Sequence, residues 1–134
     1  MKVSTRGRYA LRLMIDVAQN GGDRCLSLKE IATRQDISMK YLEQIVGKLA
    51  RAGLLQSIRG AQGGYRLSRL PEEITAGEIL RATEGSLAPV SCLETGCVRQ
   101  DSCDAAQFWR GMYDALERYA DGVTLQDFLK KTDE

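Results

Sequence analysis

Residues 27–67 constrain the fold more than any other stretch, because two capped helical patterns are followed there by a glycine-rich hairpin pattern. Ser27 is followed three positions later by Glu30, which is the capping-box spacing that starts a helix. After a short turn, Ser38 can cap a second helix over 39–52. The apolar positions of this second helix recur at i, i+3, i+4, i+7 and i+8, and they are Leu42, Ile45, Val46, Leu49 and Ala50. The spacing predicts two helices that pack through one apolar face.

Two short β-prone runs follow, at 54–58 and 65–67, and the segment that joins them contains three glycines. Glycine adopts positive φ without a Cβ penalty, so this segment can turn tightly and lie close against a partner. A two-stranded hairpin is marginally stable alone and must therefore pack on the helices. We expect a mainly α fold with a small β-hairpin wing, the winged helix-turn-helix, over residues 1–70.

The flanking segments predict further helices. The helical pattern over 5–19 can be capped by Ser4 or Thr5, and Thr75 with Glu78 forms another capping box before a helix that Gly85 ends. The expected organisation after residue 70 has three parts, which are a linker and cap helix at 71–91, an irregular cysteine loop at 92–106, and a dimerisation helix with a C-terminal short helix at 105–134.

The distribution of charge favours a nucleic-acid partner. The net charge is only +1, but residues 1–70 hold 13 Lys and Arg against 5 Asp and Glu, while residues 71–134 hold 6 against 13. A basic half is typical of a module that faces phosphates; an ordinary solvated charged surface is the alternative. No apolar run is long enough for a membrane span, and Arg12 and Asp16 interrupt the one near the start. We therefore expect a cytoplasmic protein without a membrane partner.

Double-stranded DNA is the expected partner, because the second helix of a helix-turn-helix enters the major groove with its N-terminal residues. A guanidinium at the wing tip suits a narrow minor groove, and arginines at the start of the first helix suit phosphates. The predicted DNA-binding residues are Ser4, Arg6, Arg8, Ser38, Lys40, Tyr41, Glu43, Gln44, Arg59, Gly60, Gly63 and Gly64. Two of them have a structural alternative, since Ser38 can simply cap its helix and Tyr41 can simply cover the core.

Cys92, Cys97 and Cys103 place three thiols within a short irregular segment, and the chain contains no histidine. Thiolates are soft ligands suited to iron–sulfur clusters. A zinc site with four sulfurs would need the distant Cys25, which we expect to be structural. Thiols that bind no metal are a further alternative.

An aromatic-rich stripe follows the cysteines and predicts a helix of about 16 residues. A small domain has little core to cover so much aromatic surface, so part of it is expected to meet a partner helix, with an ordinary core helix as the alternative. The residues expected at the dimer interface are Phe108, Trp109, Met112, Tyr113, Leu116 and Tyr119.

Four segments are specific in combination, and they are STRGRYAL, YLEQ, SIRG-x-x-GGY and TAGEI. Through them the chain resembles the IscR-like iron–sulfur cluster regulators of the Rrf-two family of bacterial winged helix-turn-helix transcription factors. The resemblance implies a homodimer that binds a palindromic operator, with Glu43 limiting which operators are accepted. It also implies an Fe–S cluster, [2Fe–2S] or alternatively [4Fe–4S], held by the three cysteines and by a histidine at the position of Ala106. The candidates for the fourth ligand are Asp104, Asp101, Glu94 and Gln107, a group from the other subunit, or an exogenous thiol.

The sequence therefore predicts a dimeric DNA-binding regulator, controlled by an Fe–S cluster, of iron–sulfur or related cysteine and redox metabolism. The alternative is a DNA-binding regulator that senses thiol oxidation, nitric oxide or cysteine supply without a stable cluster. An enzyme is not expected, because the chain has no histidine, nucleophile elbow or phosphate loop.

Overall fold

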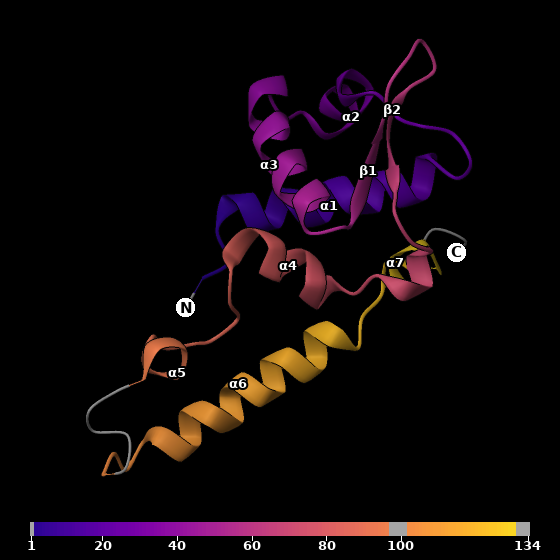
Figure 1. Ribbon diagram of the computed structural model, residues 1–134. Coiled ribbons are helices and arrows are strands. Elements are labelled where there is room, and N and C mark those ends of the chain that lie inside the picture. The colour runs from indigo at the N-terminus through magenta and orange to yellow at the C-terminus, as the bar shows by residue number, and fades with distance from the viewer. Residues whose placement is uncertain (1, 97–101, 131–134) are drawn as a thin grey trace.

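The computed structural model describes residues 2–96 and 102–130, and it is mainly helical with one hairpin (Figure 1). The elements in chain order are α1 (Thr5–Asn20), α2 (Leu28–Gln35), α3 (Met39–Arg51), β1 (Leu55–Ile58), β2 (Gly64–Leu67), the 3-10 helix η1 (Pro71–Glu73), α4 (Ala76–Glu84), α5 (Cys92–Thr95), α6 (Ala106–Asp121) and α7 (Leu125–Lys130). The predicted mainly α fold with a small wing is confirmed.

Helix α1 lies at the centre of the core and packs against α2, α3, α4, α7 and β2. Its buried face includes Leu13 and Met14, which are fully buried and meet the apolar face of α3 in one hydrophobic cluster. Four of the five residues expected in the α3 face are buried, but Ala50 is exposed, so that part of the prediction is wrong. The spacing of apolar residues predicts which face of a helix is buried, but it does not predict how far along that face the neighbouring helix extends.

The helix-turn-helix owes its geometry to two caps and one left-handed residue. Ser27 Oγ accepts a hydrogen bond from the Glu30 amide, and Ser38 Oγ accepts one from the Tyr41 amide. Asp36, at the end of α2, has a φ of 54°, a conformation that Asp tolerates better than most residues. The chain therefore turns sharply between α2 and α3.

The wing is an antiparallel hairpin in which Leu55 pairs with Leu67 and Ile58 with Gly64. Tyr65 also exchanges two backbone hydrogen bonds with Leu26, at 2.8 and 2.9 Å. This bridge attaches the wing to the segment before α2, so the hairpin does not stand alone.

Helices α4 and α6 form the second part of the molecule. In Figure 1, α6 extends beneath α4, away from the helix-turn-helix, while the chain after it returns to α1. There α7 buries Leu125 completely in the same core as α1. The segment before α6 was expected to be irregular, and within it the structure has the short helix α5, which was missed. No described helix is long and apolar enough to span a membrane.

Candidate DNA-binding surface and cysteine segment

The start of α3 presents polar side chains to solvent. Lys40, Glu43 and Gln44 are exposed on its first turns. Ser38 is exposed too, and its Oγ accepts from the Tyr41 amide at 3.2 Å, so the expected capping role is confirmed. The hydroxyl of a capping serine can still donate a hydrogen bond outward. This surface can therefore offer a cation, a carboxylate, an amide and a hydroxyl to the edges of bases.

Tyr41 is half-buried and packs against the core, as the structural alternative predicted. Its ring meets the ring of Tyr9 edge to face, with centroids 5.6 Å apart. Arg12 lies over the other ring, with its guanidinium carbon 5.1 Å from the centroid of Tyr9. The first turn of α3 is thus fixed to α1 through an aromatic pair.

A polar network fixes the turn before α3 in the same way. Asp16 of α1 is buried and accepts hydrogen bonds from Arg34 at 2.8–3.2 Å and from Gln35 at 2.8 Å. Arg12 donates to the backbone and side-chain oxygens of Gln35. Burial alone would raise the pKa of Asp16, but the hydrogen bonds and the positive charge of Arg34 outweigh it and hold that pKa below its ordinary value of 3.8.

The start of α1 carries Arg6 and Arg8, both exposed. Ser4 caps this helix by accepting from the Gly7 amide at 3.3 Å. The amide and hydroxyl of Ser4 both donate to one carboxylate oxygen of Glu84, in α4. The two arginines therefore face solvent, while the donors of Ser4 have an internal partner.

The wing tip exposes Arg59 and Gly60, and Gly60 has a φ of 113°. The other two glycines are explained by close contacts within the protein. A Cβ at Gly63 would lie 2.0 Å from the carbonyl oxygen of Ile58, and one at Gly64 would lie 2.4 Å from that of Leu26. Close approach within the protein therefore accounts for Gly63 and Gly64 without DNA.

The cysteine segment brings two thiols to one cavity. Cys92 begins α5, Cys103 precedes α6, and both line a cavity of about 100 Å³ together with Ala106. Trp109 and Arg110 complete its α6 side. Cys97 and Asp101 lie outside the described residues, so the structure gives neither a position.

The predicted fourth ligands do not share this cavity where the chain is described. Glu94, Asp104 and Gln107 are exposed and line no part of it. Within residues 2–96 and 102–130, no three His, Cys, Asp or Glu side chains gather as a metal site. Two converging thiols fit the sulfur-rich ligation of an iron cluster, and Ala106 on the cavity wall supplies no donor atom. Cys25 lies elsewhere, in a hollow beside the wing.

Helix α6 exposes a large apolar surface. The exposed fractions of Phe108, Met112 and Tyr119 are 64%, 38% and 77%, whereas Trp109, Tyr113 and Leu116 are half-buried. Tyr119 and Leu116 also line an apolar hollow of about 440 Å³ to which α1, α4 and α7 contribute. Such a surface is typical of a protein–protein contact.

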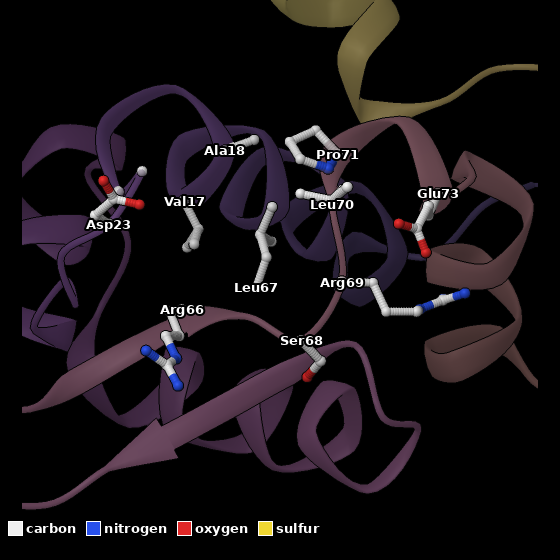
Figure 2. A pocket seen from close by; sticks show the side chains of 12 residues that line it. Val17, Ala18, Asp23, Arg66, Leu67, Ser68, Arg69, Leu70, Pro71 and Glu73 are labelled. Atoms are coloured by element: carbon white, nitrogen blue, oxygen red, sulfur yellow. The ribbon is translucent and has the colours of Figure 1, made fainter.

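A further hollow, of about 560 Å³, lies between the end of α1, the end of β2 and η1 (Figure 2). Figure 2 shows Asp23 and Arg66 at one side of it and Arg69 and Glu73 at the other. Arg69 forms an ion pair with Glu78. None of the predicted DNA-binding residues and none of the three cysteines that the structure describes lines this hollow.

The sequence did not predict several residues that organise the site. No local sequence pattern indicates Asp16, Arg34 and Gln35, because their contact joins two helices. A local signal does exist for Glu84. A carboxylate in the last turn of a helix interacts unfavourably with the helix dipole and therefore indicates a tertiary partner.

The fold and this surface define a winged helix-turn-helix DNA-binding protein. A family model described as Rrf2, iron-dependent transcriptional regulator, matches residues 3–131. The chain belongs to the Rrf2 family and is a DNA-binding transcriptional regulator.

Relatives and solved structures agree with this assignment. The chain is 44% identical to the HTH-type transcriptional regulator CymR of Bacillus subtilis (strain 168) over 133 residues, which cover 99% of this chain and 93% of the relative. The structure of CymR, described as the global cysteine regulator of B. subtilis, gives a TM-score of 0.83 at 42% identity and covers 98% of each chain.

Two further structures are similar. That of T. potens IscR gives a TM-score of 0.81 at 41% identity and covers 98% of this chain and 88% of that one. The oxidised form of Staphylococcus aureus CymR gives 0.73 at 44% identity and covers 96% and 95%. These relatives are regulators, and the chain is a regulator rather than an enzyme.

Proposed function

We propose that the protein binds a palindromic operator as a homodimer and that its cysteine segment, through an Fe–S cluster, controls this binding. The exposed residues at the start of α3, namely Lys40, Glu43 and Gln44, face the major groove. Arg59 enters the minor groove, and Arg6 and Arg8 contact phosphates. This proposal is supported by their exposure on the elements that a winged helix-turn-helix presents to DNA. As such a regulator, the protein acts in the bacterial cytoplasm.

Dimerisation follows from the exposed aromatic surface of α6. A second copy that packs along α6 removes Phe108, Met112 and Tyr119 from water and fills the hollow lined by Leu116. Two recognition helices related by a twofold axis then match half-sites about 34 Å apart.

The observation that carries the cluster proposal is the convergence of Cys92 and Cys103 on one cavity. These residues and Cys97 would hold the cluster. Its fourth ligand would be Asp101, a side chain that turns toward the cavity (Glu94, Asp104 or Gln107), a group from the other subunit, or an exogenous thiol. When bound, the cluster supplies an iron centre that is sensitive to oxidants and to small ligands such as nitric oxide. The protein's own contribution is the sulfur donors, with Trp109 and Arg110 beside them.

Control of DNA binding is supported by the location of this segment. It connects α4, which packs against α1 and α3, to α6, which is the proposed dimerisation helix. A cluster bound by the segment would favour one placement of α6 relative to α4. A coupling of about 1–3 kcal/mol between cluster and operator would suffice for a switch.

Anaerobic reconstitution tests the cluster, and selection of bound sequences from a random duplex library tests the operator. We expect visible absorbance with stoichiometric iron and sulfide, and enrichment of a palindrome. Protein without iron after reconstitution would exclude the cluster. Equal operator affinity of the apo and loaded forms would exclude the switch and leave the cluster intact.

The second candidate is a regulator of cysteine or redox metabolism that responds to thiol oxidation, nitric oxide or cysteine supply without a stable cluster. It is favoured by Ala106, which donates no ligand, and by the likeness to CymR, whose solved structures include an oxidised form. In that case mild oxidation of metal-free protein changes operator affinity, and a reductant restores it.

A further inference from the structure

We infer that Glu84 is a positioning residue for DNA binding, because its carboxylate holds the N-terminal turn of α1 at the end of α4. This inference deepens the proposed function and rests on it, since Arg6 and Arg8 of that turn are the proposed phosphate contacts. Glu84 acts through these residues and does not itself touch DNA.

The contact joins two chain segments that are 80 residues apart. One oxygen of the Glu84 carboxylate accepts the amide of Ser4 at 2.7 Å and the hydroxyl of Ser4 at 2.6 Å. Hydrogen bonds to a charged acceptor are shorter and stronger than neutral ones. Two of them on one residue fix the position of the backbone two residues before Arg6.

Gly7 makes this approach possible. It is buried in α1, and a Cβ at its position would lie 2.4 Å from the Glu84 carboxylate oxygen and 2.8 Å from a methyl carbon of Val3. Glycine lowers the stability of a helix relative to alanine. The close contact with Glu84 explains why glycine is present at this position.

Electrostatics supports the same assignment. A negative charge is unfavourable at the C-terminal end of α4 and favourable at the N-terminal end of α1. Glu84 therefore suits the helix that it contacts rather than the helix on which it lies. Arg6 and Arg8 follow the fixed residue within the first turn of α1 and are exposed.

The test is the affinity for a random-sequence 30-base-pair duplex, measured by fluorescence anisotropy over a salt series. We expect Glu84→Ala to lower the affinity about threefold to tenfold and to reduce the slope of log affinity against log salt by about one, which is the effect of one lost phosphate contact. Glu84→Gln keeps an oxygen that accepts both hydrogen bonds from Ser4, so it should retain the wild-type slope.

Glu72→Ala is the matched control, because it removes a carboxylate from the exposed 3-10 helix η1. Gly7→Ala should act like Glu84→Ala, since the added methyl displaces the carboxylate, although alanine favours the helix. Thermal unfolding of each variant, recorded by circular dichroism, confirms that binding is measured on folded protein.

Wild-type affinity in Glu84→Ala overturns the inference. So does an equal change in Glu84→Ala and Glu84→Gln, because charge alone would then be responsible. The proposed function fails separately, if the wild-type protein shows no salt-dependent affinity or if Arg6→Ala and Arg8→Ala bind as the wild type does.

Discussion

At the scale of single residues, the buried carboxylate of Asp16 connects α1 to the turn of the helix-turn-helix. Arg34 and Gln35 satisfy it, and Asn20 adds a side-chain contact at 3.4 Å. A buried carboxylate with matched donors is stabilising only while those donors remain. The position of α3, the proposed recognition helix, therefore depends on a residue that lies outside the proposed DNA-binding surface.

We expect Asp16→Asn to lower the free energy of unfolding by about 2–3 kcal/mol at neutral pH, because Arg34 loses its charged acceptor. The folded pKa of Asp16 lies below its ordinary value of 3.8, so its contribution is present above that pH and is lost as the pH falls through the lower folded value. Urea unfolding at several pH values measures this, with the exposed Asp23→Asn as the control. A difference between wild type and Asp16→Asn that does not shrink as the pH falls below 3.8 would contradict the expectation.

Tyr9 provides a second residue-scale prediction. Tyr9→Ala removes the ring that meets Tyr41 and carries Arg12, and an aromatic pair is worth about 0.5–1.5 kcal/mol beyond its buried area. We expect a loss of operator affinity of about tenfold. Tyr9→Phe keeps the ring and should retain affinity within about twofold. If both variants bind equally well, the aromatic pair does not position α3.

At the scale of elements, α4 is attached to α6 by one arginine and one close approach. Arg81 donates to both carboxylate oxygens of Asp121 at 2.8 Å and to Glu117 at 3.1 Å. A Cβ at Gly77 would lie 2.0 Å from the Asp121 carboxylate. The angle between α4 and α6 is therefore defined by a small set of polar contacts.

Gly77→Ala should lower the free energy of unfolding by about 1–2 kcal/mol, because the methyl displaces Asp121 from Arg81. Gly111→Ala on α6 is the matched control, since a Cβ added at Gly111 would meet nothing within 4 Å among the described residues. There the higher helix propensity of alanine should add about 0.5–1 kcal/mol. Thermal unfolding of both variants distinguishes the expected destabilisation by Gly77→Ala from the expected stabilisation by Gly111→Ala. Equal stabilisation would show that Asp121 adjusts freely.

The secondary-structure elements differ in how well the sequence predicts them. Helices α1, α2, α3, α4 and α6 and the wing were predicted to within a few residues, because caps, glycines and periodicity are local. The start of α5 at Cys92 was missed, since four residues contain only about one helical period. The contact between Ser4 and Glu84 was missed as well, because no local pattern encodes a pair so distant in sequence. The positions of the thiols relative to Ala106 also required the fold.

At the scale of the whole molecule, the exposed face of α6 is the proposed dimer contact. Tyr119→Arg places a charge in the apolar hollow beside Leu116, so we expect the dimer dissociation constant to rise on the order of 100-fold. Sedimentation velocity measures this, with Glu72→Arg as the control. A monomer should also lose about half of the salt dependence of DNA binding. An unchanged dimer would place the interface elsewhere.

The attachments at the two ends of α4 have a geometrical consequence. This helix of nine residues is only about 13 Å long. A tilt of about 10° around the close approach of Gly77 to Asp121, at the other end of the helix, would move Glu84 by roughly 2 Å, which exceeds the tolerance of its hydrogen bonds to Ser4. Small rotations of α6 relative to the body must therefore either carry α1 along or break the contact, and the helix acts as a short stiff lever between the proposed dimer contact and the proposed DNA-binding surface.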